Sequence, residues 1–110
     1  MQAPASERTL PAVGRFTPRT LPRPSILRLA GALDAFTVKD ALPRMDSVAE
    51  DSHVVVDLAA LELLDSAGVH ALVTLYKRVT AKGGKMVVIN AHDQPLAVLG
   101  VLNLKAVFGV

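Results

Sequence analysis

The spacing of apolar residues changes repeatedly along the chain from position 25 onward, and three short runs have the character of strands. Residues 26–29 predict a strand that stops at Gly31. The valine-rich run 53–58 and the run 85–90 each predict a buried strand, because β-branched residues favour strands. Residues 106–108 predict a short strand at the end of the chain.

Between the first two strands, the apolar residues of 38–49 fall on one face at helical spacing. Thr37 and Asp40 resemble a capping box at the start of this helix. Pro43 removes a hydrogen bond from a helix interior, so we expect either a kink or a second helix start there.

Two further helices are predicted in the second half of the chain. Residues 59–64 are expected to form a connection, and a long helix follows over 66–82. The residues of this helix expected to face inward are Val69, Leu72, Val73, Tyr76 and Val79. Residues 83–84, both glycine, supply its left-handed stop. Pro95 is expected at the first position of the last helix, which closes at Asn103.

This alternation predicts a small α/β domain with a four- or five-stranded, mostly parallel sheet packed against three or more helices. One of the strands could lie within residues 10–16, where Val13 and Phe16 can reach a core. The flanking prolines limit it to an edge strand.

Proline and charge divide the chain into an N-terminal segment, 1–24, and a folded domain, 25–110. The segment contains five of the seven prolines, four of the twelve basic residues and one of the ten acidic residues. The rest of the chain therefore carries 8 basic and 9 acidic residues. With few aromatic residues and no basic stripe, it does not match a nucleic-acid-binding surface.

The composition excludes several other classes of function. The absence of cysteine excludes disulfides, thiolate catalysis and thiol redox switches. No apolar run is long enough to span a membrane or serve as a signal peptide, so we expect a cytoplasmic protein with no membrane partner.

The stretch 63–69, Leu-Leu-Asp-Ser-Ala-Gly-Val, places Ser66 near the start of the long helix. Asp65 and Ser66 are preferred helix caps, and the small residues after them allow close packing, so a purely structural role is one explanation. The other explanation is that Ser66 is a site of phosphorylation. Free backbone N–H groups and the helix dipole make a helix start tolerant of an added phosphate.

Catalytic and metal sites fit the pattern poorly. Asp65, Ser66 and His70 could suggest a hydrolase, but residues on one helix cannot surround a substrate, and a nucleophile elbow is missing. His53 and His92 lie in separate elements without metal-ligand spacing. We therefore expect neither an enzyme nor a metal or cofactor site.

The segments 29–34, 54–58, 65–68 and 83–84 together resemble the STAS domain of anti-sigma-factor antagonists, over about residues 26–110. In that family the serine after the aspartate is phosphorylated by a partner anti-sigma factor with a kinase-type ATP-binding fold. The resemblance assigns this role to Ser66. Several members carry a second serine where this chain has Ala67.

The resemblance implies an anti-sigma-factor antagonist that is switched off by phosphorylation of Ser66. The expected partner-binding residues are Leu64, Asp65, Ser66, Ala67, Gly68 and Val69. The expected partner is a kinase-type anti-sigma factor, and a phosphatase and a second copy of the chain remain open as further partners. Two alternatives also stay open: a non-phosphorylated STAS accessory or scaffold subunit of a transport or stress-signalling assembly, and a small-molecule sensor.

Overall fold

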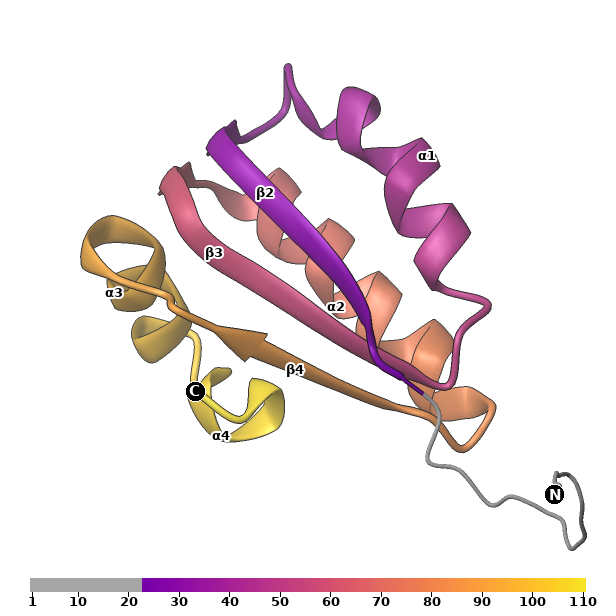
Figure 1. Ribbon diagram of the computed structural model, residues 1–110. Helices are drawn as coiled ribbons and strands as arrows, with labels where there is room; N and C mark the ends of the chain where they lie inside the picture. Colours follow the sequence, from indigo (N-terminus) through magenta and orange to yellow (C-terminus); the bar gives the residue numbers. More distant parts are fainter. Residues whose placement is uncertain (1–22) are drawn as a thin grey trace, which may run out of the picture.

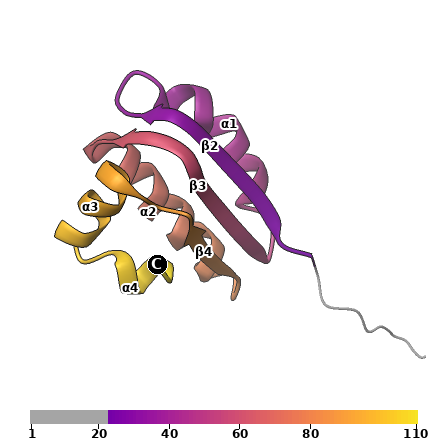
Figure 2. The same ribbon diagram turned by 60° about the vertical axis from the view of Figure 1, so that its left-hand side comes forward.

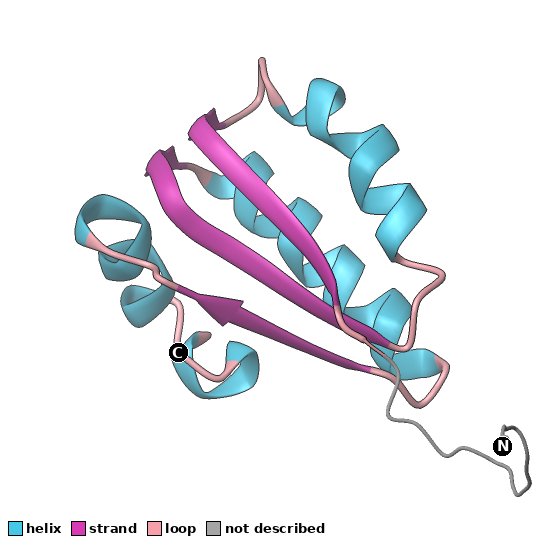
Figure 3. Ribbon diagram, in the orientation of Figure 1, coloured by secondary structure: helices cyan, strands magenta, loops and turns pink. Residues whose placement is uncertain are grey.

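The computed structural model describes residues 23–110, which form a parallel sheet with helices along it (Figures 1 and 3). The strands are β2 (Ser25–Leu33), β3 (His53–Leu64) and β4 (Lys85–Ile89), in the order β2-β3-β4. Both neighbouring pairs are parallel. The predicted α/β class and parallel sheet are therefore confirmed.

Four helices accompany the sheet in the described residues. Helix α1 (Val38–Val48) and helix α2 (Ser66–Ala81) lie side by side across one face (Figures 1 and 2). Helix α3 (Asp93–Val101) packs against β3, and the short helix α4 (Lys105–Phe108) packs against β4. Connections between parallel strands require crossovers, and here α1 and α2 are those crossovers, whereas α3 and α4 follow the last strand.

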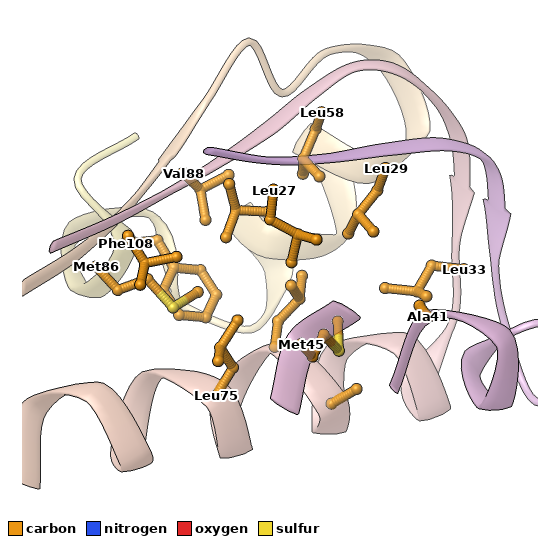
Figure 4. Close-up of a cluster of buried hydrophobic side chains, with 14 of the residues drawn as sticks. Leu27, Leu29, Leu33, Ala41, Met45, Leu58, Leu75, Met86, Val88 and Phe108 are labelled. Atoms are coloured by element: carbon orange, nitrogen blue, oxygen red, sulfur yellow. The ribbon is translucent and has the colours of Figure 1, made fainter. Parts of the chain in front are cut away.

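The core fills the space between this face of the sheet and the helices (Figure 4). Alternate strand residues point into it, as the period of a strand requires. The strand residues in the core are Leu27, Leu29, Leu33, Val54, Val56, Leu58, Leu61, Leu64, Met86 and Val88. Phe108 closes one end and meets Tyr76 edge-to-face, with ring centroids 5.7 Å apart. Leu75, which is fully buried in α2, was missed by the prediction, whereas Val73 and Tyr76 are half-buried.

The prediction that residues 59–64 form a connection is wrong, because β3 continues to Leu64. Its pairing with β2 is irregular at two places, where β3 carries an extra residue relative to β2. Each bulge shifts the inward-facing position by one. The buried residues Leu58, Leu61 and Leu64 are consequently three apart, a spacing that hides the strand from a search for period two.

Strand β2 also runs further than expected, through Gly31 to Leu33. Gly31 has φ of 72° and lies next to the second irregularity, so the glycine shapes the strand and does not end it.

The predicted strand at residues 106–108 is wrong, because these residues belong to α4, where the Phe108 N–H donates to the Leu104 carbonyl at 3.0 Å. Residues 23–110 thus contain three strands, fewer than the four or five predicted. The candidate edge strand at 10–16 lies outside the described residues.

Two predictions about helix starts are also corrected, and the alternatives at Pro43 are narrowed. Thr37 makes no side-chain cap to α1, since its hydroxyl accepts from the Asp34 N–H at 3.0 Å and donates to the Ala32 carbonyl at 2.8 Å. Helix α1 runs through Pro43 without a second start. Helix α3 begins at Asp93, so Pro95 is its third residue. Among residues 23–110, no helix has both the length and the apolar character needed to cross a membrane.

Candidate functional site

Ser66 is the first residue of α2, and its side chain is exposed. The preceding Asp65 is the N-cap, in an extended conformation. Its Oδ1 accepts a hydrogen bond from the Gly68 N–H at 3.1 Å, and its carbonyl accepts one from the Val69 N–H at 2.9 Å. The aspartate thus satisfies an otherwise free donor of the first helical turn and fixes the position of Ser66.

The same aspartate also ties the β3–α2 connection to the neighbouring β2–α1 loop. Its Oδ2 accepts from the Ala35 N–H at 3.2 Å, and its backbone N–H donates to the Leu33 carbonyl at 3.2 Å. Both loops lie at the carboxyl ends of adjacent parallel strands, which brings them to one edge of the sheet.

Asp34 organises the β2–α1 loop. Its Oδ1 accepts from the Thr37 and Phe36 N–H groups, each at 2.9 Å. These bonds stabilise the charged carboxylate, and the Thr37 N–H, followed by the Phe36 N–H, lowers the pKa of Asp34 below its usual value. The loop holds Phe36 with its side chain 83% exposed, on the segment that Ala35 links to Asp65.

Gly68 allows α2 to approach the ends of β2 and β3 closely. A Cβ at this position would lie 2.3 Å from the Leu33 carbonyl oxygen and 2.8 Å from Leu64 Cδ1. Only glycine fits without a shift of the helix, and this contact sets the height of Ser66 above the sheet.

An apolar groove of about 330 Å³ opens beside Ser66, between the start of α2 and helix α3. It is lined by Leu64, Asp65, Ser66, Gln94, Ala97, Val98, Val101 and Leu102, with neither Lys nor Arg among these lining residues. Val101 is 82% exposed, and Leu102 and the nearby Leu63 are also exposed. Apolar surface of this kind commonly marks a protein contact.

Three of the six residues expected to bind the partner are buried in the free protein. Leu64 is 0% exposed and Val69 is 8% exposed, and Gly68 is buried where α2 meets the ends of β2 and β3. These three residues support the site from below. Of the predicted set, only Ser66 is exposed, while Asp65 and Ala67 are half-buried.

Polar side chains also gather on β3 at the point where β4 ends. Asp57 Oδ1 accepts from the Ala59 N–H at 2.9 Å and from Asn90 Nδ2 at 3.1 Å. The Ala59 N–H, followed by the Asn90 amide, lowers the pKa of Asp57. Both contacts favour the carboxylate in the folded state.

His92 connects the start of α3 with β3. Its Nδ1 lies 2.6 Å from the Asp93 carboxylate and its Nε2 lies 2.9 Å from the Ala59 carbonyl oxygen. Two acceptors favour the doubly protonated imidazolium, and the Asp93 carboxylate, followed by the Ala59 carbonyl, raises the pKa of His92.

The other candidate chemistry finds no support in residues 23–110. Three or more His, Asp or Glu side chains do not gather anywhere in this part of the chain as a metal site would require. His70 is exposed on α2, and no side-chain hydrogen bond joins it to Ser66 in these residues.

The sequence of the chain is similar to those of known proteins. The STAS domain family matches residues 15–110. The chain belongs to the STAS domain family. The anti-sigma F factor antagonist of Paenibacillus polymyxa is 33% identical to this chain over 70 residues. That match covers 61% of this chain and 60% of the length of the Paenibacillus protein.

A solved structure has a similar fold. The anti-sigma factor antagonist SpoIIAA in its unphosphorylated form aligns with a TM-score of 0.66 at 19% identity, covering 84% of each chain. At this identity the likeness concerns the fold alone.

Sequence reasoning found Asp65 and Ser66 but missed Phe36, Val101 and Leu102. Each is an apolar residue in a segment predicted as a loop or helix, and nothing in its local pattern marks it as exposed. The groove joins residues 64–66 with residues 94–102, which are far apart in the sequence, so only the fold reveals it.

Proposed function

We propose that this STAS protein is an anti-sigma-factor antagonist that binds a kinase-type anti-sigma factor and is switched off by phosphorylation of Ser66. The proposal depends above all on one observation: an exposed serine begins α2 on an aspartate cap, beside an apolar groove. The likeness to the Paenibacillus anti-sigma F factor antagonist supports the same partner class. The protein would act in the cytoplasm as a binding module and a kinase substrate, with no catalysis of its own.

Before modification, the partner would cover Ser66, Ala67 and the apolar groove. Burial of the exposed Val101 and Leu102 side chains supplies a favourable hydrophobic contribution. Phe36 lies on the adjoining loop and would extend the contact.

In the switch, Ser66 Oγ attacks the γ-phosphorus of ATP bound to the partner. The bond from that phosphorus to the β–γ bridging oxygen breaks, ADP leaves, and the hydroxyl proton passes to a base of the partner. The phosphoserine carries about −1.5 to −2 charges.

That charge would lie beside the Asp65 carboxylate and an apolar groove whose lining contains neither Lys nor Arg. Burying it without a cation opposes binding, while the solvated helix start tolerates it in the free protein. Phosphorylation therefore releases the partner and leaves the fold intact.

The test is a parallel capture from lysate of the source organism with wild-type protein and Ser66→Asp, together with the intact mass of the endogenous protein. We expect wild type to retain a kinase-type anti-sigma factor that Ser66→Asp loses, and a phosphorylated mass to appear. Equal capture of transport or scaffold components by both proteins, without added phosphate, would contradict the proposal and favour an accessory subunit.

A further inference from the structure

Strand β3 extends well past its neighbour β4. The last residue of β4, Ile89, is paired with Asp57, whereas β3 continues to Leu64. On the side facing β4, the backbone groups of this extension have no strand to pair with. Leu64 is fully buried, so its backbone N–H and carbonyl require other partners.

The side chain of Gln94 supplies those partners. The Leu64 N–H donates to Gln94 Oε1 at 2.8 Å, and Gln94 Nε2 donates to the Leu64 carbonyl at 2.9 Å. The Gln94 side-chain amide thus both donates to and accepts from the backbone of Leu64, as the backbone of a neighbouring strand would. Gln94 is the second residue of α3, so this exchange attaches α3 to the end of β3.

The attachment at Leu64 lies two residues before Ser66. Leu64 is followed by Asp65, whose N–H is held on the opposite side by the Leu33 carbonyl at 3.2 Å. The end of β3 is therefore fixed from both edges just where Asp65 begins to cap α2 and present Ser66.

Gln94 also lines the groove beside Ser66, and Ala97, Val98 and Val101 of the same helix form its wall. The same side chain therefore contacts both the end of β3 and the apolar wall beside Ser66.

We infer that Gln94 is a positioning residue for Ser66. Its side chain makes the hydrogen bonds that a neighbouring strand would make at the end of β3, and it holds the β3–α2 connection and α3 in one fixed arrangement. The expected effect of Gln94 on phosphorylation of Ser66 rests on the proposed function. The positioning itself can be measured without any partner.

Two substitutions separate positioning from general stability. Gln94→Leu keeps a side chain of similar size but removes both hydrogen bonds, which leaves two backbone groups of Leu64 unpaired. Gln94→Glu keeps an acceptor for the Leu64 N–H but, when ionised, has no donor for the carbonyl, so it serves as the conservative partial rescue. Glu62→Gln, at an exposed position of the same stretch of β3, is the matched control.

The first measurement is amide hydrogen exchange by NMR on the full chain. In Gln94→Leu we expect the Leu64 amide to exchange about tenfold faster than in wild type, with the Val56 amide in the middle of β3 unchanged. Gln94→Glu should fall between them, and Glu62→Gln should match wild type. Unchanged Leu64 exchange in Gln94→Leu would overturn the inference, as would equal acceleration of Leu64 and Val56, which indicates only global destabilisation.

The second measurement is phosphoryl transfer from each purified kinase-type anti-sigma factor of the source organism with Mg-ATP. Where wild type is phosphorylated at Ser66, Gln94→Leu should lower kcat about tenfold with a smaller change in KM, and Gln94→Glu should recover part of the loss. An unchanged kcat despite faster Leu64 exchange would overturn the positioning role. If wild type is phosphorylated by none of these kinases, the proposed function fails, and the exchange measurement still decides whether Gln94 fixes the loop.

Discussion

The Oδ1 atom of Asp65 accepts a hydrogen bond from the backbone N–H of Gly68 at 3.1 Å, across the first turn of α2. Ser66 lies between these two residues on the outer side of the turn. The aspartate fixes the helix start, and the glycine lets that start approach β2 and β3 closely. Both residues therefore help to fix where the serine hydroxyl lies, Asp65 from a half-buried and Gly68 from a buried position.

Removing the cap should cost stability. Asp65→Ala deletes the acceptor for the Gly68 N–H and the link to Ala35, and should lower the free energy of unfolding by about 1–2 kcal/mol. Asp65→Asn keeps a carbonyl acceptor and should lose less. Urea denaturation followed by circular dichroism measures both, and equal stability of Asp65→Ala and wild type would contradict the capping role.

Gly68→Ala should destabilise the protein more than the addition of one methyl group suggests. The new Cβ would meet the Leu33 carbonyl oxygen at 2.3 Å, which forces α2 to move and should cost about 1–3 kcal/mol. Gly100→Ala is the matched control, because its Cβ would meet only Lys105 Cδ at 3.6 Å. It should be neutral or gain up to about 1 kcal/mol. Equal effects of the two substitutions in urea denaturation would refute the close approach.

The contribution of His92 to stability should depend on pH. Its pKa is raised in the folded protein by Asp93 and by the Ala59 carbonyl, with Glu62 also contributing. The stabilisation is fully present below the unfolded value of about 6.5 and is lost as pH rises through the folded-state pKa.

We therefore expect the difference in free energy of unfolding between wild type and His92→Ala to shrink as pH increases through this window. Urea denaturation at several pH values and an NMR titration of the imidazole would measure it. His70→Ala removes an exposed imidazole from α2 and is the control. A difference that grows with pH would contradict the assigned contacts.

A charge in the apolar groove should weaken partner binding without unfolding the protein. Val101 is 82% exposed, so Val101→Glu costs little in the free chain, but its carboxylate would be desolvated in the complex. Affinity for the captured anti-sigma factor, measured by calorimetric titration, should fall at least about tenfold. Val107→Glu, at an exposed apolar position of α4, should bind like wild type. Equal loss from both would exclude a specific role for the groove.

The sequence was sufficient for the α/β class, the three strands of the described sheet and the aspartate–serine start of α2, because each depends on local spacing and composition. It failed at the end of β3, where two bulges place the buried residues three apart. It also failed at residues 106–108. Their strand-like composition is overridden because Phe108 packs into the core against Tyr76 within a helical turn.

Only part of the candidate site could be predicted from the sequence. Asp65 and Ser66 follow from a contiguous motif, but the burial of Leu64 and Val69 depends on how α2 packs on the sheet. Gln94 and Val101 reach the site from about 30 residues away, through tertiary contacts that no local pattern encodes. The division of the chain at residue 24 stays a prediction.

The most direct test of the account compares affinities for the captured anti-sigma factor of unmodified protein and of protein carrying phosphoserine at position 66, introduced during synthesis. Phosphoserine at position 47, exposed on α1, adds the same charge elsewhere and is the control. We expect the modification at 66 to weaken binding by at least about tenfold, the control to bind like unmodified protein, and both to unfold at similar urea concentrations. Equal affinity of all three proteins would contradict the switch.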